Sequence, residues 1–342
     1  MKSFGGLIAR FAKVASVALP AVVAGSLLAT PALASEPSDI ESAFDRALGT
    51  ELRGPRTYDS PLEARIAALA NASNGRIGVA AVDLSSGHTL DVLGTQRFPM
   101  ASTSKIAVAA TFLEGVDQGR WSLTSEFPLM IPVGSAKHSS AVAPVRRGNY
   151  MPAHQLIEIM ITRSSNPATD ALLAVVGGPK AVNDWARRAG IPDFQINRDI
   201  ATLVRDDGEV DPATVIDPRD SATPLAMTQM LVGLYQGKWL SPRSRSVIMG
   251  AMSRTVTGKR RIPALMPQDA RVSHKTGSLY NTSSDIGIIE TPDGRAMAVA
   301  IYVTGQGSRL NRERRIASIA RAIYDGYNSR QFAYREAGRR SR

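Results

Sequence analysis

The order of hydrophobic patterns along the 342-residue chain predicts an α+β fold. Strand-like runs lie at residues 76–93 and again at 271–303, whereas helical spacing dominates from 101 to about 265 and returns at 310–327. Early and late strands can share one core if both ends of the chain complete the same sheet. We therefore expect an antiparallel sheet flanked by helices, an all-helical lobe from the middle of the chain, and a functional site between the two lobes.

Local patterns place the individual elements. The folded domain should begin at Pro61 with a short helix, followed by a hairpin whose strands are 76–84 and 89–93. Helices should fill the middle of the chain, interrupted by loops at 134–150 and 190–221. The late strands and the last helix are expected at 271–278, 285–290, 297–303 and 310–327, with a hairpin turn at Pro292-Asp293-Gly294.

The first 34 residues have the pattern of a secretory signal peptide. Lys2, Arg10 and Lys13 give a basic start, Val14–Leu28 is apolar, and Ala32-Leu33-Ala34 is a small-residue cleavage site. The alternative is an uncleaved membrane anchor, which the small-residue end of the run disfavours. We expect cleavage near Ala34 and a periplasmic or secreted protein.

The rest of the chain divides into an N-terminal extension (35–60) with a short amphipathic helix at 38–48, a folded domain (61–327) and a basic tail (328–342). The tail carries Arg330, Arg335, Arg339, Arg340 and Arg342 against the single acid Glu336. We interpret it as a solvated end, with attraction to anionic envelope polymers or lipid as the alternative. Nucleic acid is not an expected partner of an exported protein.

Composition excludes several kinds of site. The chain has no cysteine, which rules out disulfides, iron–sulfur clusters and cysteine–zinc sites. Its four histidines, His88, His138, His154 and His274, are scattered and lack the clustered spacing of a metallo-hydrolase. We therefore expect no metal and no cofactor.

Ser102 and Lys105 lie three residues apart at the start of the apolar run Ile106–Leu113. Positions i and i+3 share one face of a helix, so the lysine amine can reach the serine hydroxyl. A serine hydroxyl becomes a good nucleophile when a neighbour takes its proton, and a lysine desolvated in a pocket can do this. The pair predicts a nucleophile with its base, although Ser102 alone would also suit a helix N-cap.

Two patterns downstream complete an ordered set. Ser164-Ser165-Asn166 opens a second helical run, and His274-Lys275-Thr276-Gly277-Ser278 ends a strand-like segment. The order Ser-x-x-Lys, Ser-x-Asn, Lys-Thr-Gly is the signature of penicillin-recognising serine enzymes. With this spacing, and with similar segments at 97–100, 177–179, 220–224 and 283–289, the domain resembles a class A β-lactamase-like serine hydrolase. The resemblance implies a β-lactamase/transpeptidase-like fold and hydrolysis of β-lactam rings.

The resemblance also implies catalytic roles for three of these residues. Ser102 would be acylated, with the backbone N–H groups of Ser102 and Ser278 as the oxyanion hole. Lys105 would be the acylation base or a proton relay. Ser164 would bridge to the β-lactam nitrogen and deliver its proton as that nitrogen leaves.

Other residues would bind the substrate. Asn166 would donate to its side-chain amide, and Lys275 and Thr276 would supply a charge and a hydroxyl for its carboxylate. Gly277 would let the substrate backbone lie against the strand edge. Ser165 replaces the usual aspartate of the Ser-Asp-Asn motif, and we expect this change to affect loop stability only.

The residue that holds the substrate carboxylate is expected outside these motifs. Many class A enzymes place an arginine on the strand after Lys-Thr-Gly, but residues 279–289 contain none. Arg261 lies where other members carry a substitute. The alternative is that Arg261 and Arg260 form a solvated charge pair.

The loop that carries the family's deacylation base departs from its pattern. The family motif is Arg-x-Glu-x-x-Leu-Asn, whereas here Arg198 is followed two residues later by Ile200. Asp220 should pair with Arg198 across the loop neck, yet counting back from Asp220 by the family spacing reaches Asp207. Candidates for a replacement base are Asp206, Asp207 and Glu209. If these acids only keep the loop soluble, the acyl-enzyme should form and then stall.

Three functions remain open from the sequence. The first is a monomeric β-lactamase that acts on β-lactams or peptidoglycan-like small substrates. The second is a D-Ala-D-Ala-directed peptidase or other cell-wall enzyme that β-lactams inhibit. The third is a β-lactam-binding protein without turnover, which the presence of Ser102, Lys105, Ser164 and Lys275 argues against.

Overall fold

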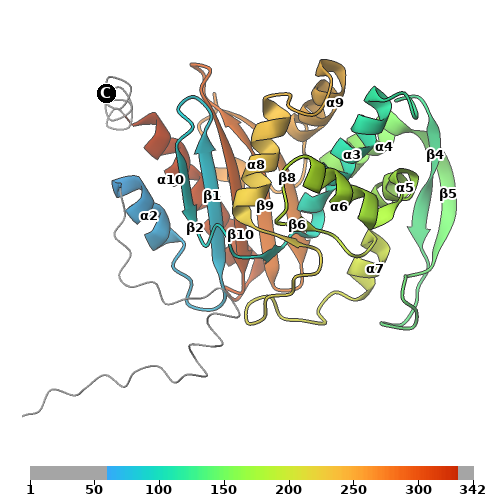
Figure 1. Ribbon diagram of the computed structural model, residues 1–342. Helices are drawn as coiled ribbons and strands as arrows, with labels where there is room; N and C mark the ends of the chain where they lie inside the picture. The colour runs from blue at the N-terminus through green and yellow to red at the C-terminus, as the bar shows by residue number, and fades with distance from the viewer. Residues whose placement is uncertain (1–59, 330–342) are drawn as a thin grey trace, which may run out of the picture. The chain divides into compact units, whose positions relative to one another are not determined.

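A computed structural model describes residues 60–329 of the chain, arranged as a sheet with helices on both faces and a helical lobe beside it (Figure 1). The expected signal peptide, the helix at 38–48 and the arginines of the tail lie outside the described residues. Within residues 60–329, no helix is both long enough and apolar enough to cross a membrane.

The main sheet confirms the expected antiparallel arrangement. Its strand order is β2-β1-β10-β9-β8. The first strand pairs with the last one, with Ile77 opposite Val303, so both ends of the chain complete the sheet. The strands are β1 (Ile77–Asp83), β2 (Thr89–Val92), β8 (Arg271–Leu279), β9 (Thr282–Glu290) and β10 (Ala296–Thr304).

Both faces of this sheet are buried, as the uninterrupted apolar sequence of β10 requires. Met297, Val299 and Ile301 belong to a core under α2 (Pro61–Leu69) and α10 (Arg309–Asn328). The alternate residues Ala298, Ala300 and Tyr302 join a larger core under α8 (Pro224–Tyr235) and the helical lobe. Ser60 and Ser308 begin α2 and α10 as N-caps, accepting backbone hydrogen bonds from Glu63 and Asn311.

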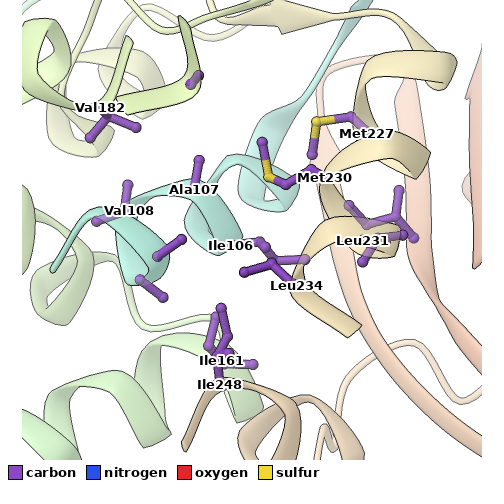
Figure 2. Packing of buried hydrophobic residues seen from close by; sticks show 14 of the residues in the cluster. Ile106, Ala107, Val108, Ile161, Val182, Met227, Met230, Leu231, Leu234 and Ile248 are labelled. Carbon is purple, nitrogen blue, oxygen red and sulfur yellow. The ribbon is translucent and has the colours of Figure 1, made fainter. Parts of the chain in front are cut away.

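The helical lobe is packed around α3 (Lys105–Asp117), which is buried on nearly all sides. Figure 2 shows Ile106 and Val108 of this helix among apolar side chains from neighbouring helices, including Leu234 and Ile248. Such close packing fixes the start of α3, where Lys105 lies directly after the turn that carries Ser102. The other helices are α4 (Ala153–Thr162), α5 (Asn166–Val176), α6 (Gly178–Arg188) and α9 (Pro242–Ser253).

Two expected loops contain regular structure. Residues 134–150 were expected to be irregular, but β4 (Glu126–Pro132) and β5 (Val145–Pro152) form a two-stranded hairpin that includes the last six residues of this segment. Two prolines and a register shift interrupt β4, which hides the period-two pattern of a strand. The segment 190–221 contains short elements: β6 (Phe194–Gln195), α7 (Ile200–Arg205) and the start of β7 (Ser221–Ala222), which pairs with β3 (Phe98–Pro99).

Candidate active site

Ser102 lies on a short 3₁₀ turn, η1 (Ala101–Ser104), that leads directly into α3. The neighbours of Ser102 are buried and fixed: the hydroxyl of Thr103 donates to the Met100 carbonyl and that of Ser104 to the Ala101 carbonyl, each at 2.8 Å. Ser102 itself is half-buried. Ala101 has a φ of 49°, in the left-handed region that costs a non-glycine residue about 1–3 kcal/mol. The turn is therefore held in a strained shape by its surroundings, with the serine near the surface.

The hydroxyl of Ser164 lies between two buried amines. Lys275 Nζ donates to Ser164 Oγ at 2.9 Å, and Lys105 Nζ lies 3.3 Å from the same oxygen. Lys105 also donates to the Ser164 carbonyl at 2.8 Å and to Asn166 Oδ1 at 2.7 Å. Ser164 has a left-handed φ of 59°, so this residue too is held by its contacts.

These contacts modify the expected pairing of Ser102 with Lys105. Among the described residues, the hydrogen bonds of the Lys105 amine go to Ser164 and Asn166, and none goes to Ser102. The first two motifs are therefore joined through the lysine, with Ser102 beside the resulting cluster on the preceding turn.

Burial changes the acid–base properties of both lysines. Removal from water lowers the pKa of Lys105 from 10.5 to about 7, against the opposing attraction of Asp170. Burial and the like charge of Lys105 hold the pKa of Lys275 well below its usual range. Lys105 is therefore a base that can accept a proton near neutral pH.

Ser165 has the structural role expected for the changed residue of the second motif. Its side chain accepts a hydrogen bond from the Ala168 backbone N–H and caps the start of α5. The cap places Asn166 at the first position of the helix, where its side chain meets Lys105.

Arg261 is fully buried, so the alternative of a solvated charge pair is wrong for this residue. Its side chain is 1% exposed, whereas that of Arg260 is 70% exposed. Arg261 donates to the Gly277 and Ser284 carbonyls at 2.7 Å and to Ser278 Oγ at 2.6 Å. It thus fixes the end of the third motif and the orientation of the Ser278 hydroxyl.

Gly277 has a packing role that the sequence did not indicate. A Cβ at this position would lie 2.6 Å from the Met100 carbonyl and 3.1 Å from the Ala101 Cβ. The glycine therefore lets β8 pack directly on the turn that carries Ser102. The neighbouring Thr276 hydroxyl is hydrogen-bonded at 2.8 Å to the hydroxyl of Thr257. Thr257 belongs to none of the three motifs.

The neck of the long loop is closed as expected. Arg198 Nε donates to Asp220 Oδ2 at 2.7 Å, and both side chains are largely buried. The other oxygen of Asp220 accepts the backbone N–H groups of Asn197 and Arg198 at 2.7 and 3.1 Å. The predicted ion pair is therefore confirmed, with the carboxylate fully used by the loop.

The three candidate bases of this loop are bonded to partners other than the residues of the lysine cluster. Arg205 pairs with Asp206 at 2.8 Å, and its hydrogen bond holds the pKa of Asp206 below its usual range. The carboxylate of Asp207 accepts the Tyr280 backbone N–H at the end of β8. Glu209 pairs with Arg219 at 3.2 Å. Together the three acids line a separate cavity of about 60 Å³, whose lining includes none of the residues of the three motifs.

The acid that does interact with Lys105 is Asp170, which the sequence analysis missed. It is buried on α5, where its two oxygens accept the backbone N–H groups of Ile200 at 2.7 Å and Ala201 at 2.9 Å. Burial raises the pKa of Asp170 to about 6, and Lys105 opposes that rise. An acid four residues after Asn166 in an otherwise apolar helix was the available signal, because i and i+4 share a face.

Comparisons with known proteins agree with this geometry. Residues 61–327 match the model of the beta-lactamase enzyme family. The chain is 31% identical over 269 residues to β-lactamase CTX-M-8 of Citrobacter amalonaticus, covering 78% of this chain and 89% of that one.

Two solved structures are also similar. A β-lactamase from Chitinophaga pinensis superposes with a TM-score of 0.68 at 26% identity, covering 79% of this chain and all of that one. An ancestral class A β-lactamase, representing the last common ancestor of Gram-negative bacteria, superposes with a TM-score of 0.66 at 33% identity, covering 78% of this chain and 99% of that one.

Proposed function

The chain belongs to the beta-lactamase enzyme family, and we propose that it opens β-lactam rings through an acyl-enzyme on Ser102. The observation that carries this proposal is the Ser164 hydroxyl between two buried amines, next to the strained turn that presents Ser102. This arrangement can take a proton from one oxygen and return it to a leaving nitrogen without help from bulk water.

Acylation would use each group of the cluster once. Ser102 Oγ attacks the lactam carbonyl carbon as its proton passes to neutral Lys105. The carbon–nitrogen bond then breaks, and Ser164 gives its proton to the leaving nitrogen while it takes the proton held by Lys105, 3.3 Å away. The product is an ester on Ser102 with the ring opened, and Lys105 is neutral again.

Substrate binding would use the residues around this path. Lys275, Thr276 and the Ser278 hydroxyl, which Arg261 holds at 2.6 Å, form a site for the substrate carboxylate. Because Asn166 Oδ1 accepts from Lys105, its NH₂ group is the part that would donate to a substrate amide carbonyl.

Hydrolysis of the ester should be the slow step. Ile200 stands at the position of the family's deacylating glutamate, and its side chain cannot accept a proton. Asp206, Asp207 and Glu209 are occupied by Arg205, Tyr280 and Arg219 respectively. Loss of a general base typically slows a step by about 10²–10⁴-fold, so we propose weak turnover with a long-lived acyl-enzyme.

Acylation should depend on pH through Lys105. Only the neutral amine accepts the Ser102 proton, and the pKa of Lys105 is about 7. The acylation rate should therefore rise as pH increases through about 7 and level off above it. A rate that is flat from pH 5 to 9 would exclude Lys105 as the base.

Intact mass spectrometry after mixing with a penicillin tests the acyl-enzyme directly. The protein mass should rise by the mass of one penicillin, because ring opening by addition loses no atoms. Ser102→Ala should give no adduct, while Ser104→Ala, whose hydroxyl is bonded to the Ala101 carbonyl, should still be acylated. An adduct that persists in Ser102→Ala would overturn the assignment of the nucleophile.

We also propose export to the periplasm with cleavage after Ala34. Support comes from the basic start, the apolar run and the small-residue end of the first 34 residues. N-terminal sequencing of protein recovered from the periplasm should begin at Ser35. An intact N-terminus in a membrane fraction would favour the anchor instead.

The working unit is proposed to be a monomer that needs no metal or cofactor, since every step above uses side chains of one chain. Light scattering on the purified protein should give the mass of one chain. Acylation should be unchanged by a chelator, and loss of acylation on chelation would contradict this proposal.

A further inference from the structure

Asp170 joins the long loop to the lysine cluster. It lies on α5, one helical turn after Asn166, and its carboxylate is buried. One oxygen accepts the Ile200 N–H and the other the Ala201 N–H, which are the first two backbone donors of α7. These donors would otherwise lack partners at the start of the helix.

The charges around Lys105 come from two elements. Asp170 lies on the same face of α5 as Asn166, which accepts from Lys105 at 2.7 Å, and its negative charge raises the pKa of Lys105. Lys105 in turn lowers the pKa of Lys275 on β8, with which it shares the Ser164 hydroxyl. Asp170 in turn is repelled by Asp199, which precedes α7. Among residues 60–329, Asp170 is therefore the acid whose negative charge stabilises the protonated form of Lys105.

We propose that Asp170 is a positioning residue that supplies the negative charge facing Lys105 and, with the same carboxylate, holds the backbone of Ile200 against the helical lobe. This inference rests on the proposed function, in which Lys105 accepts the Ser102 proton. The acid next to Lys105 is thus provided by α5 and not by the loop, where Ile200 has no carboxylate.

The charge and the loop contact make different predictions. Removing the negative charge should lower the pKa of Lys105, because an opposite charge nearby favours the protonated amine. More of the lysine is then neutral at low pH, so the rise of acylation with pH should move to lower pH. A role limited to holding the loop would lower the acylation rate without moving this rise.

The experiment compares Asp170→Asn with Asp220→Asn as a matched control. Each carboxylate accepts two backbone N–H groups of the same loop, but only Asp170 interacts with Lys105. Acylation rates are measured by intact mass with one penicillin from pH 5 to 9. We expect the midpoint of the rise to fall by about one pH unit in Asp170→Asn and to stay in place in Asp220→Asn.

Each outcome decides the inference. A lower acylation rate with an unmoved midpoint in Asp170→Asn, or an equal shift in both variants, would overturn the charge role. Failure of the wild-type protein to form any adduct would instead overturn the proposed function, and the charge role would then be decided by NMR titration of Lys105 in ¹³C-labelled protein.

A reciprocal variant covers the case in which Asp170→Asn does not fold. Linkage requires that removal of the lysine charge raise the pKa of Asp170 by as much as the acid raises that of Lys105. NMR titration of labelled aspartate in Lys105→Met should therefore show the midpoint of Asp170 rising above its wild-type value of about 6. An unchanged Asp170 midpoint would show that the two groups do not interact.

Discussion

The lysine cluster and the long loop are both rich in buried charged groups, but they use them in different ways. In the cluster, Lys105 and Lys275 share one hydroxyl and donate to neutral oxygens, so neither amine forms a hydrogen-bonded ion pair with any of residues 60–329. In the loop between Arg198 and Asp220, the carboxylates are paired with arginines or bonded to backbone N–H groups. A carboxylate that is paired with a cation or bonded to N–H groups stabilises the local fold and stays ionised. A desolvated amine without a counter-ion has a lowered pKa and can therefore exchange a proton near neutral pH.

This comparison indicates that the structure is arranged to support acylation but offers no free base for deacylation within the loop between Arg198 and Asp220. The groups that acylation needs are brought together by contacts between the three motifs. The loop that would serve deacylation has a structural role instead. The Arg198–Asp220 ion pair closes its neck, and Asp170 binds it to α5 by accepting two of its backbone N–H groups. The following variants test this difference, beginning with the largest expected effect.

Lys105→Ala should slow acylation by about 10²–10⁴-fold, because it removes the base that takes the Ser102 proton. The rate of adduct formation by intact mass provides the measurement. Lys180→Ala, at an exposed position paired with Asp184, serves as the control and should acylate at the wild-type rate. Equal rates in the two variants would mean that the cluster is not the acylation machinery.

Asp220→Asn should lower the free energy of unfolding by about 3 kcal/mol, since it leaves the largely buried Arg198 without its counter-charge. Urea unfolding gives the magnitude, and protease cleavage within 198–220 should become faster. In the control Asp217→Asn, the more exposed pair with Arg219 should contribute less than about 1 kcal/mol. A loss of the same size in both variants would argue against a closed neck.

Gly277→Ala should lower the free energy of unfolding by about 1–3 kcal/mol and also slow acylation. The added methyl would meet the Met100 carbonyl at 2.6 Å, so β8 or the Ser102 turn must shift. Gly134→Ala is the control, because a Cβ there meets nothing within 4 Å. Wild-type stability and acylation in Gly277→Ala would show that the close approach of β8 is not required.

Asp206→Asn, Asp207→Asn and Glu209→Gln should each leave decay of the acyl-enzyme unchanged, the smallest effect in the series. The three carboxylates are already bonded to Arg205, to the Tyr280 backbone N–H and to Arg219 respectively, so none should serve as a base. Decay is followed by the loss of the adduct mass after excess penicillin is removed. Slowing by about 10²-fold in one variant would identify that residue as the deacylation base.

The sequence predicted those parts of the site whose residues lie only a few positions apart along the chain. Ser102 and Lys105 share one turn, and Ser164, Ser165 and Asn166 share one helix start, so their proximity follows from local geometry. The five-stranded sheet was equally predictable, because β1 and β10 carry apolar runs that must be buried on both faces.

Features that depend on contacts between distant segments were not predictable in the same way. The position of Asp170 four residues after Asn166 was visible in the sequence, but its contact with α7 depends on how α5 packs against α7, and no pattern within either segment records that contact. Arg261 was located, but its burial depends on β8, β9 and Glu313 of α10. The β4–β5 hairpin was missed because prolines and surface arginines obscure the alternation that identifies a strand.

The relative rates of the two steps test the central difference most directly. Wild-type protein is mixed with excess penicillin, and the acylated fraction and the hydrolysed product are measured in the same time course. We predict that nearly all of the protein becomes acylated before appreciable product forms, and that product then appears at the rate at which the isolated adduct decays. Rapid hydrolysis with no detectable adduct would contradict it, because the loop would then be supplying a deacylation base.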